Sequence, residues 1–125
     1  MRIYARACFL IAVFLVVTPL SAWAHAFPEH QSPEVGAVLK RSPKAVIIRF
    51  DRDIEAPFCT LRVINLAGKR VDKKDTHAMP GRADTLIVSL PPLMNGRYHV
   101  YWTAIARDGH HTLGDYFFTV RNTTR

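Results

Sequence analysis

Short runs of alternating apolar and polar residues, separated by proline, glycine and asparagine, follow residue 25. A period of two is typical of β-strands, because successive side chains point to opposite faces. The pattern predicts strands over residues 46–50, 58–66, 69–71, 85–90, 98–106 and 115–120, and an irregular strand near 25–30. About seven short strands predict an all-β fold, an immunoglobulin-like Greek-key β-sandwich.

The same alternation predicts which side chains form the core. In the longest strand one face carries Tyr98, Val100, Trp102, Ala104 and Ala106. Cys59 shares its face with Leu61 and Val63, so we expect a small buried hydrophobe there; a copper thiolate is the rarer alternative. The polar stretch over residues 72–84 is predicted as a loop.

The first 24 residues have the pattern of a secretory signal peptide. Arg2 and Arg6 precede an apolar run over residues 7–17, and Ala22-Trp23-Ala24 ends the segment as a small-x-small cleavage site. That run is too short for a membrane span, which takes roughly 20 residues. We therefore expect residues 1–24 to be removed, leaving one exported domain over 25–125 that starts at His25 and has no membrane span. An uncleaved N-terminal anchor is the less favoured alternative.

Net charge and cysteine content limit the possible partners of the protein and the ways in which its fold can be stabilised. Loss of Arg2 and Arg6 lowers the formal net charge from +7 to +5. The remaining basic residues lie in turns without interleaved aromatic residues, so we interpret them as solvated loop charge and expect no nucleic-acid partner. Only Cys59 remains after residue 24, so no internal disulfide can form and packing must hold the fold.

Three residues are candidate metal ligands. A histidine at a chain terminus is a chelate, since its α-amine and Nδ1 can close a six-membered ring on one ion, and His25 gains this amine on cleavage. Asp108 and His110 follow the longest strand. In extended backbone they would point to the same side, with Cα atoms roughly 6.6–6.8 Å apart. Asp-x-His alone is more often a pair of solvated turn residues, and it forms a site only if another ligand joins it.

Several motifs occur in a fixed order after residue 24. They are His25-Ala26-Phe27, Ser32-Pro33-Glu34-x-Gly36, Phe50 before an acidic stretch, Gly96-x-Tyr98-x-Val100-x-Trp102, Ala106-Arg107-Asp108-Gly109-His110 and Gly114-Asp115-Tyr116-x-Phe118-Thr119-Val120. In this order and spacing the chain resembles the copper resistance protein CopC family of periplasmic copper-binding proteins. The resemblance implies a β-sandwich that binds one Cu(II) through the amine and imidazole of His25, joined by Asp108 and His110.

The implied ligands suit the implied metal. Three nitrogens and one carboxylate oxygen form a tetragonal set, which Cu(II) prefers, whereas zinc prefers a tetrahedron. Protons should compete with copper in mild acid, because reference pKa values are about 7.7–8.0 for an α-amine and about 6.5 for imidazole. The resemblance implies a binding protein and not an enzyme, acting in copper buffering, resistance or delivery to a CopD-like membrane copper transporter.

Two other functions stay open. A terminal histidine with a second histidine also builds the copper brace of lytic polysaccharide monooxygenases, although those enzymes usually have a larger domain and an open axial position. A metal-free structural sandwich would bind no stoichiometric copper.

Two features depart from the family pattern. Many relatives carry a methionine-rich loop that binds Cu(I), whereas the loop over residues 72–84 offers only His77 and Met79. We expect an ordinary loop with little Cu(I) binding, a weak remnant site being the alternative. Some relatives place a glutamate just after the phenylalanine that corresponds to Phe50, where this chain has Asp51-Arg52-Asp53, and whether Asp51 or Asp53 approaches the copper is left open.

The other histidines are expected outside the site. His30 is predicted on the surface, and His99 is predicted to be solvent-exposed or paired across strands. His111 should point away from His110.

Overall fold

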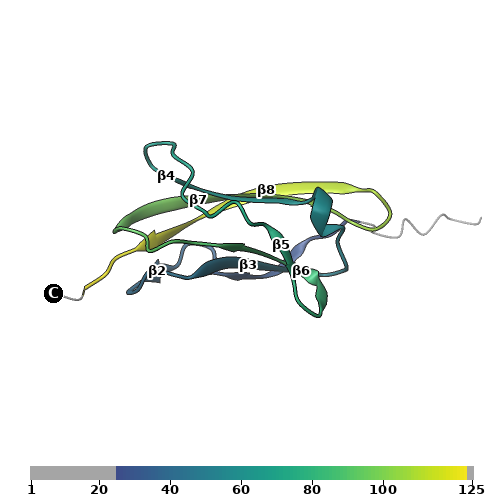
Figure 1. Ribbon diagram of the computed structural model, residues 1–125, viewed down its shortest axis with the longest axis horizontal. Coiled ribbons are helices and arrows are strands. Elements are labelled where there is room, and N and C mark those ends of the chain that lie inside the picture. Colours follow the sequence, from purple (N-terminus) through teal and green to yellow (C-terminus); the bar gives the residue numbers. More distant parts are fainter. Residues whose placement is uncertain (1–24, 124–125) are drawn as a thin grey trace, which may run out of the picture.

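The computed structural model describes residues 25–123, which form two four-stranded β-sheets packed face to face (Figure 1). The first sheet has the order β1 (Pro28–Ser32), β3 (Ala45–Phe50), β6 (Arg82–Ser89), β5 (His77–Met79). The second has the order β2 (Val38–Leu39), β8 (His111–Val120), β7 (Gly96–Ile105), β4 (Thr60–Asn65). A short 3-10 turn, η1 (Ala56–Phe58), precedes β4. The predicted all-β sandwich is confirmed.

The core lies between the sheets and is built by the alternation that the sequence shows. Along β7 the buried residues are Tyr98, Val100, Trp102 and Ala104, and β3 supplies Val46, Ile48 and Phe50. Cys59 is buried as predicted, and its thiol donates a hydrogen bond to the carbonyl of Glu55. Burial raises the pKa of this thiol.

Three predicted boundaries are wrong. The stretch over residues 72–84 is not all loop, because β5 pairs with β6 there, with His77 opposite Ile87, and β6 begins at Arg82 and not at residue 85. The strand predicted over 69–71 is a single bridge between Ile64 and Arg70. β8 begins at His111 and not at residue 115, so it runs through Gly114.

Gly114 has a packing reason to be glycine. It lies opposite Trp102 in the β7–β8 register, and a Cβ at this position would lie 2.5 Å from Cζ2 of the indole. Glycine normally weakens a strand. Here it lets the buried Trp102 side chain lie against the neighbouring strand.

The outer edge of β4 is covered by the segment that follows it. Asp72 is central to this cover, since its side chain is fully buried and accepts hydrogen bonds from the backbone of Val63 and Lys74, both at 2.8 Å. The guanidinium of Arg70 donates to the same carboxylate at 2.9 Å. Burial alone would raise the pKa of Asp72, but these hydrogen bonds together outweigh it and lower the pKa below its usual value.

The two ends of the sandwich are different. The described chain starts beside the β7–β8 turn and terminates at the opposite end (Figure 1). Within residues 25–123 no helix has the length and apolar character needed to cross a membrane.

Candidate metal centre

The segment around His25 is fixed against both sheets. Ala26 is fully buried, and its carbonyl accepts a hydrogen bond from Oγ1 of Thr112 in β8 at 2.7 Å. Two hydrogen bonds connect Phe27 and Asp51. The Phe27 N–H donates to Oδ1 of Asp51 at 3.0 Å, and the Asp51 N–H donates to the Phe27 carbonyl at 2.9 Å. These contacts hold His25 at the end where β7 turns into β8.

Asp108 and His110 lie in a tight turn and not in extended backbone. The Gly109 N–H donates to the Ala106 carbonyl at 2.9 Å, and the Ala106 N–H donates to the His110 carbonyl at 3.0 Å. Gly109 has a φ of 89°, in the region that favours glycine. The extended geometry expected for this motif is therefore wrong.

The turn nevertheless brings the side chains of Asp108 and His110 into contact. Oδ1 of Asp108 accepts the His110 N–H at 3.1 Å, and Oδ2 lies 2.9 Å from Nδ1 of the His110 imidazole. The hydrogen bond from the His110 backbone, followed by that from its imidazole, lowers the pKa of Asp108. Asp108 is therefore a carboxylate at neutral pH and a potential oxygen ligand.

His25 reaches this pair from the other end of the sequence. Its ring centroid lies 5.0 Å from that of His110, with the ring planes inclined by 27°. Two imidazoles on one ion place their centroids about 4–6 Å apart when metal–nitrogen bonds are about 2.0 Å. The structure thus brings His25, Asp108 and His110 together at the end of the sandwich where β7 turns into β8.

The rings are stacked and do not converge on one point. Within residues 25–123, no three His, Cys, Asp or Glu side chains are arranged so that they could hold a metal ion together. The His110 and Asp108 side chains are 54% and 41% exposed, so rotation about their side-chain torsions is open to them. The fourth donor of the expected set, the α-amine of His25, belongs only to a chain that starts at this residue.

The neighbouring acids have other partners. Asp51 binds the backbone of Phe27 and also lies 3.3 Å from Nε of Arg52. Asp53 pairs with Arg107 at 3.2 Å. Asp51 and Thr112 position the histidine segment, a role that the sequence alone did not reveal because their partners lie far away along the chain.

The remaining candidates lie elsewhere. The predicted cross-strand pairing of His99 is confirmed: Nε2 lies 2.5 Å from Oδ2 of Asp115, and the ring stacks on Phe117 with centroids 3.8 Å apart. His30 and His111 are exposed. His77 contacts the Asp75 carbonyl from β5, whereas Met79 lines a shallow hollow together with His30.

Comparison with known proteins defines the class. The model of the CopC domain matches residues 28–121, so this chain belongs to the CopC family and the resemblance drawn from its motifs is confirmed. The chain is 31% identical to the protein YobA of Escherichia coli K12 over 117 residues, which cover 93% of this chain and 94% of YobA. It is also 31% identical, over 112 residues, to the copper transport protein CutJ of Bacillus subtilis; the match covers 89% of this chain but only 21% of CutJ.

Solved structures agree on the fold. CopC from Methylosinus trichosporium OB3b superposes with a TM-score of 0.75 at 28% identity, covering 81% of this chain and 98% of that one. PcoC, a methionine-rich copper resistance protein from E. coli, gives a TM-score of 0.70 at 21% identity, covering 78% and 100%. At that identity the PcoC likeness concerns the sandwich alone.

Proposed function

We propose that this protein is a periplasmic copper-binding protein that holds one Cu(II) per chain. The ligands are the amine and imidazole of His25, exposed by removal of residues 1–24, together with Asp108 and His110. One observation carries the proposal: two histidines from opposite ends of a CopC-family chain have ring centroids 5.0 Å apart, with a carboxylate 2.9 Å from one of them.

The contacts of Asp108 suggest how the ligands are arranged. Its Oδ2 lies against Nδ1 of His110, which leaves Nε2 as the free nitrogen of that ring. An ion bound to Nε2 would lie on the far side of the ring from this carboxylate, so Asp108 and His110 can ligate one ion only after the contact with Nδ1 opens and the exposed side chains rotate. Three nitrogens and the freed carboxylate oxygen then suit the tetragonal preference of Cu(II).

The exposed position of the site supports a role in holding and passing on copper. Asp108 and His110 project from a turn at the end of the domain, where another protein can reach them. Membership of the CopC family and the name of one similar protein, a copper transport protein, support buffering, resistance or delivery to a CopD-like membrane copper transporter.

The proposal is for binding and not for catalysis. A copper-loaded protein that generated peroxide in the presence of a reductant would contradict it and favour a monooxygenase-like brace. Failure to retain any stoichiometric copper after dialysis would favour a metal-free structural sandwich.

Substitution of the ligands tests the proposal, with neighbouring histidines as controls. In the chain that starts at His25, we expect His110→Ala to weaken Cu(II) binding by roughly 100-fold or more and Asp108→Ala by roughly 10–100-fold. His111→Ala and His99→Ala should change it little. Competition against a chromophoric Cu(II) chelator measures the affinities, and thermal unfolding checks that each variant folds. A loss with His111→Ala equal to that with His110→Ala would overturn the ligand assignment.

A further inference from the structure

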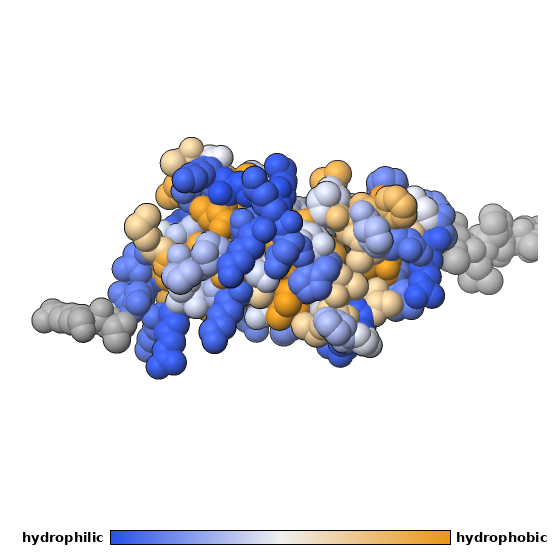
Figure 2. Space-filling view, in the orientation of Figure 1, coloured by the Kyte–Doolittle hydropathy of each residue, from blue (hydrophilic) through white to orange (hydrophobic). Residues whose placement is uncertain are grey.

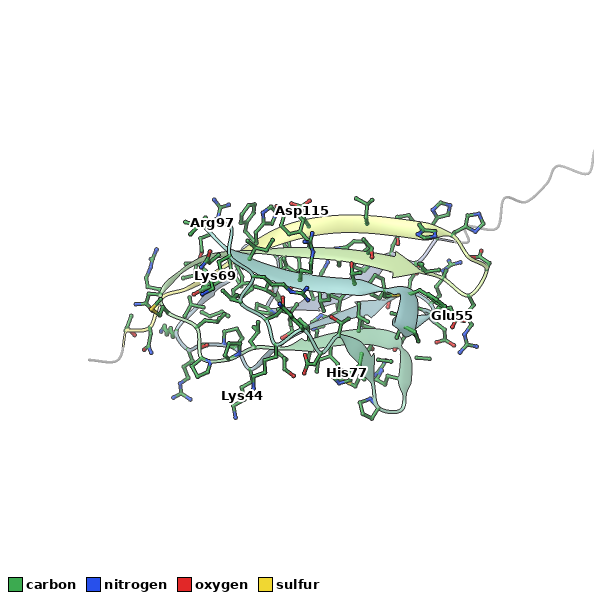
Figure 3. All side chains as sticks on the ribbon, turned by 45° about the horizontal axis from the view of Figure 1, so that its top comes forward. Lys44, Glu55, Lys69, His77, Arg97 and Asp115 are labelled. Atoms are coloured by element: carbon green, nitrogen blue, oxygen red, sulfur yellow. The ribbon has the colours of Figure 1, made fainter. Side chains whose placement is uncertain are left out.

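Every lysine of the chain lies at the end of the sandwich opposite His25 and His110. Lys40 follows β2, Lys44 precedes β3, and Lys69 lies in the turn after β4. Lys73 and Lys74 lie beside the last residue of β6, since the Lys73 N–H donates to the Ser89 carbonyl at 2.9 Å. Figure 3 shows Lys44, Lys69 and Arg97 toward one end of the molecule and Glu55 at the other. We call this region the basic end.

Three arginines add to this charge, and little negative charge opposes it. Arg97 is the second residue of β7, Arg121 follows β8, and the Arg121 N–H donates to the Leu39 carbonyl beside Lys40 and Arg41. Within residues 25–123, the lysines and these three arginines form no ion pair with a carboxylate. At the opposite end, by contrast, Arg52, Arg82 and Arg107 are each paired with an aspartate.

The acids nearest the basic end are already engaged. Asp72 is buried against Arg70, and Asp75 accepts a hydrogen bond from the Ser89 N–H at 2.8 Å. Arg70 neutralises Asp72, whereas Asp75 keeps its charge, and the five lysines and three arginines outweigh it. The net charge of this surface is therefore strongly positive.

Two aliphatic side chains project from the same surface. Leu66, in the turn after β4, is 74% exposed, and Met94, in the turn before β7, is 83% exposed. Both line one shallow hollow together with Arg97, so the two turns are neighbours. Figure 2 shows strongly hydrophilic side chains projecting at this end with hydrophobic atoms among them. A single exposed aliphatic residue needs no explanation, but two at adjacent turn tips within a cationic surface form an amphipathic edge.

We propose that the basic end docks on the surface of a bilayer containing anionic phospholipids, with Leu66 and Met94 inserted among the headgroups. Cationic side chains near such a surface each strengthen binding about fivefold, and peripheral attachment usually combines charge with an apolar anchor. The aliphatic tips favour a bilayer over nucleic acid or a purely acidic protein surface, since only the bilayer offers an apolar layer behind its charges. The proposal does not depend on the copper site.

Docking in this way orients the molecule. The ten residues of β7 span the sandwich from the basic end to the β7–β8 turn, which is about 30 Å at the usual rise of a strand. His25 and His110 would then face away from the bilayer.

Vesicle co-sedimentation of residues 25–125 tests the proposal. This form is used because the apolar run over residues 7–17 would itself bind lipid, and because residues 25–123 contain both sheets and the core between them. We expect binding to phosphatidylcholine vesicles containing phosphatidylglycerol, weakened by high salt, and little binding to pure phosphatidylcholine. No binding to the anionic vesicles at low salt would overturn the proposal.

Matched variants separate docking from net charge. Arg41→Gln with Arg121→Gln removes two charges from the basic end and should weaken binding about 25-fold. Arg49→Gln with Arg82→Gln removes the same charge elsewhere and should matter far less. Equal losses for the two pairs would show attraction by net charge alone and would overturn the assignment of this end.

A second pair of control substitutions tests the exposed side chains of Leu66 and Met94. Leu66→Ser with Met94→Ser should weaken vesicle binding, whereas Phe58→Ser with Leu113→Ser, at positions 67% and 79% exposed, should not. If the tip variant bound vesicles normally and soluble polyglutamate displaced the protein completely, the basic end would be a site for acidic proteins, and the bilayer proposal would be wrong.

Discussion

Asp72 places a negative charge inside the protein, where three donors surround it. Its carboxylate accepts from the backbone of Val63 and Lys74 and from Arg70. Because its pKa is lower in the folded chain than its ordinary value of about 3.9, the unfolded chain takes up the proton first as the pH falls. Its contribution to stability is therefore complete above about pH 5 and is lost as the pH falls through the folded pKa.

Replacement of this carboxylate should destabilise the fold in a pH-dependent way. We expect Asp72→Asn to lower the free energy of unfolding by about 2–4 kcal/mol at pH 7, because Arg70 and two backbone donors lose a charged acceptor. Urea unfolding at pH 7 and at pH 3 measures the difference. The deficit should shrink at pH 3, and a deficit that stayed constant would contradict this account of the charge.

Single residues also set the limit of what the sequence could predict about the site. His25, Asp108 and His110 were identified from their chemistry and motifs, and the structure places them together. The extended geometry expected for Asp108 and His110 was wrong, because Gly109 takes a positive φ and turns the chain there. Glycine permits that conformation but does not require it.

The site depends on how two elements meet, the segment leading into β1 and the start of β8. A single side-chain hydrogen bond, from Thr112 to the Ala26 carbonyl, joins β8 to the residue beside His25. The backbone pairing of Phe27 with Asp51 holds the same segment to the end of β3. Thr112 is therefore a positioning residue for His25.

Loss of the Thr112 hydroxyl should weaken copper binding more than it destabilises the fold. We expect Thr112→Val to weaken Cu(II) binding by about 3- to 10-fold, because a hydrogen bond of this kind contributes about 0.5–1.5 kcal/mol. The melting temperature should fall by only a few degrees. Chelator competition and thermal unfolding measure the two effects.

Thr103→Val is the matched control for this prediction. Oγ1 of Thr103 lies 2.7 Å from that of Thr60 on the same sheet, so the change removes a similar hydrogen bond away from His25. Equal copper affinities for the two threonine variants would show that Thr112 does not position His25.

The β-strands could be predicted from the sequence where the alternation of apolar and polar residues is long and one face of the strand is buried. β3, β4 and β7 were found for that reason, and the inward faces expected for β4 and β7 are correct. β2 was missed because two residues cannot show a period. β5 and the start of β6 were missed because their flanks are polar and their residues are exposed or only partly buried, and β5 also lies at a sheet edge.

At the scale of the whole molecule, the two proposed functions belong to opposite ends of the sandwich. One end carries His25 and His110 together with paired acids, and the other carries lysines and arginines that, within residues 25–123, form no ion pair with a carboxylate. The sequence contained this charge, but the separation appears only once the strands fix which turns share an end. Neither proposal depends on the other, since copper binding can be measured without lipid and docking without copper.

The central claim is that Cu(II) is held by a histidine at the start of the mature chain. The most direct measurement is a Cu(II) titration of the chain that begins at His25 beside the same chain with one glycine added before His25. We expect one tightly bound Cu(II) per chain for the first and a drop in affinity of at least an order of magnitude for the second, because the added residue converts the amine into an amide. Equal affinities would contradict the terminal-histidine site.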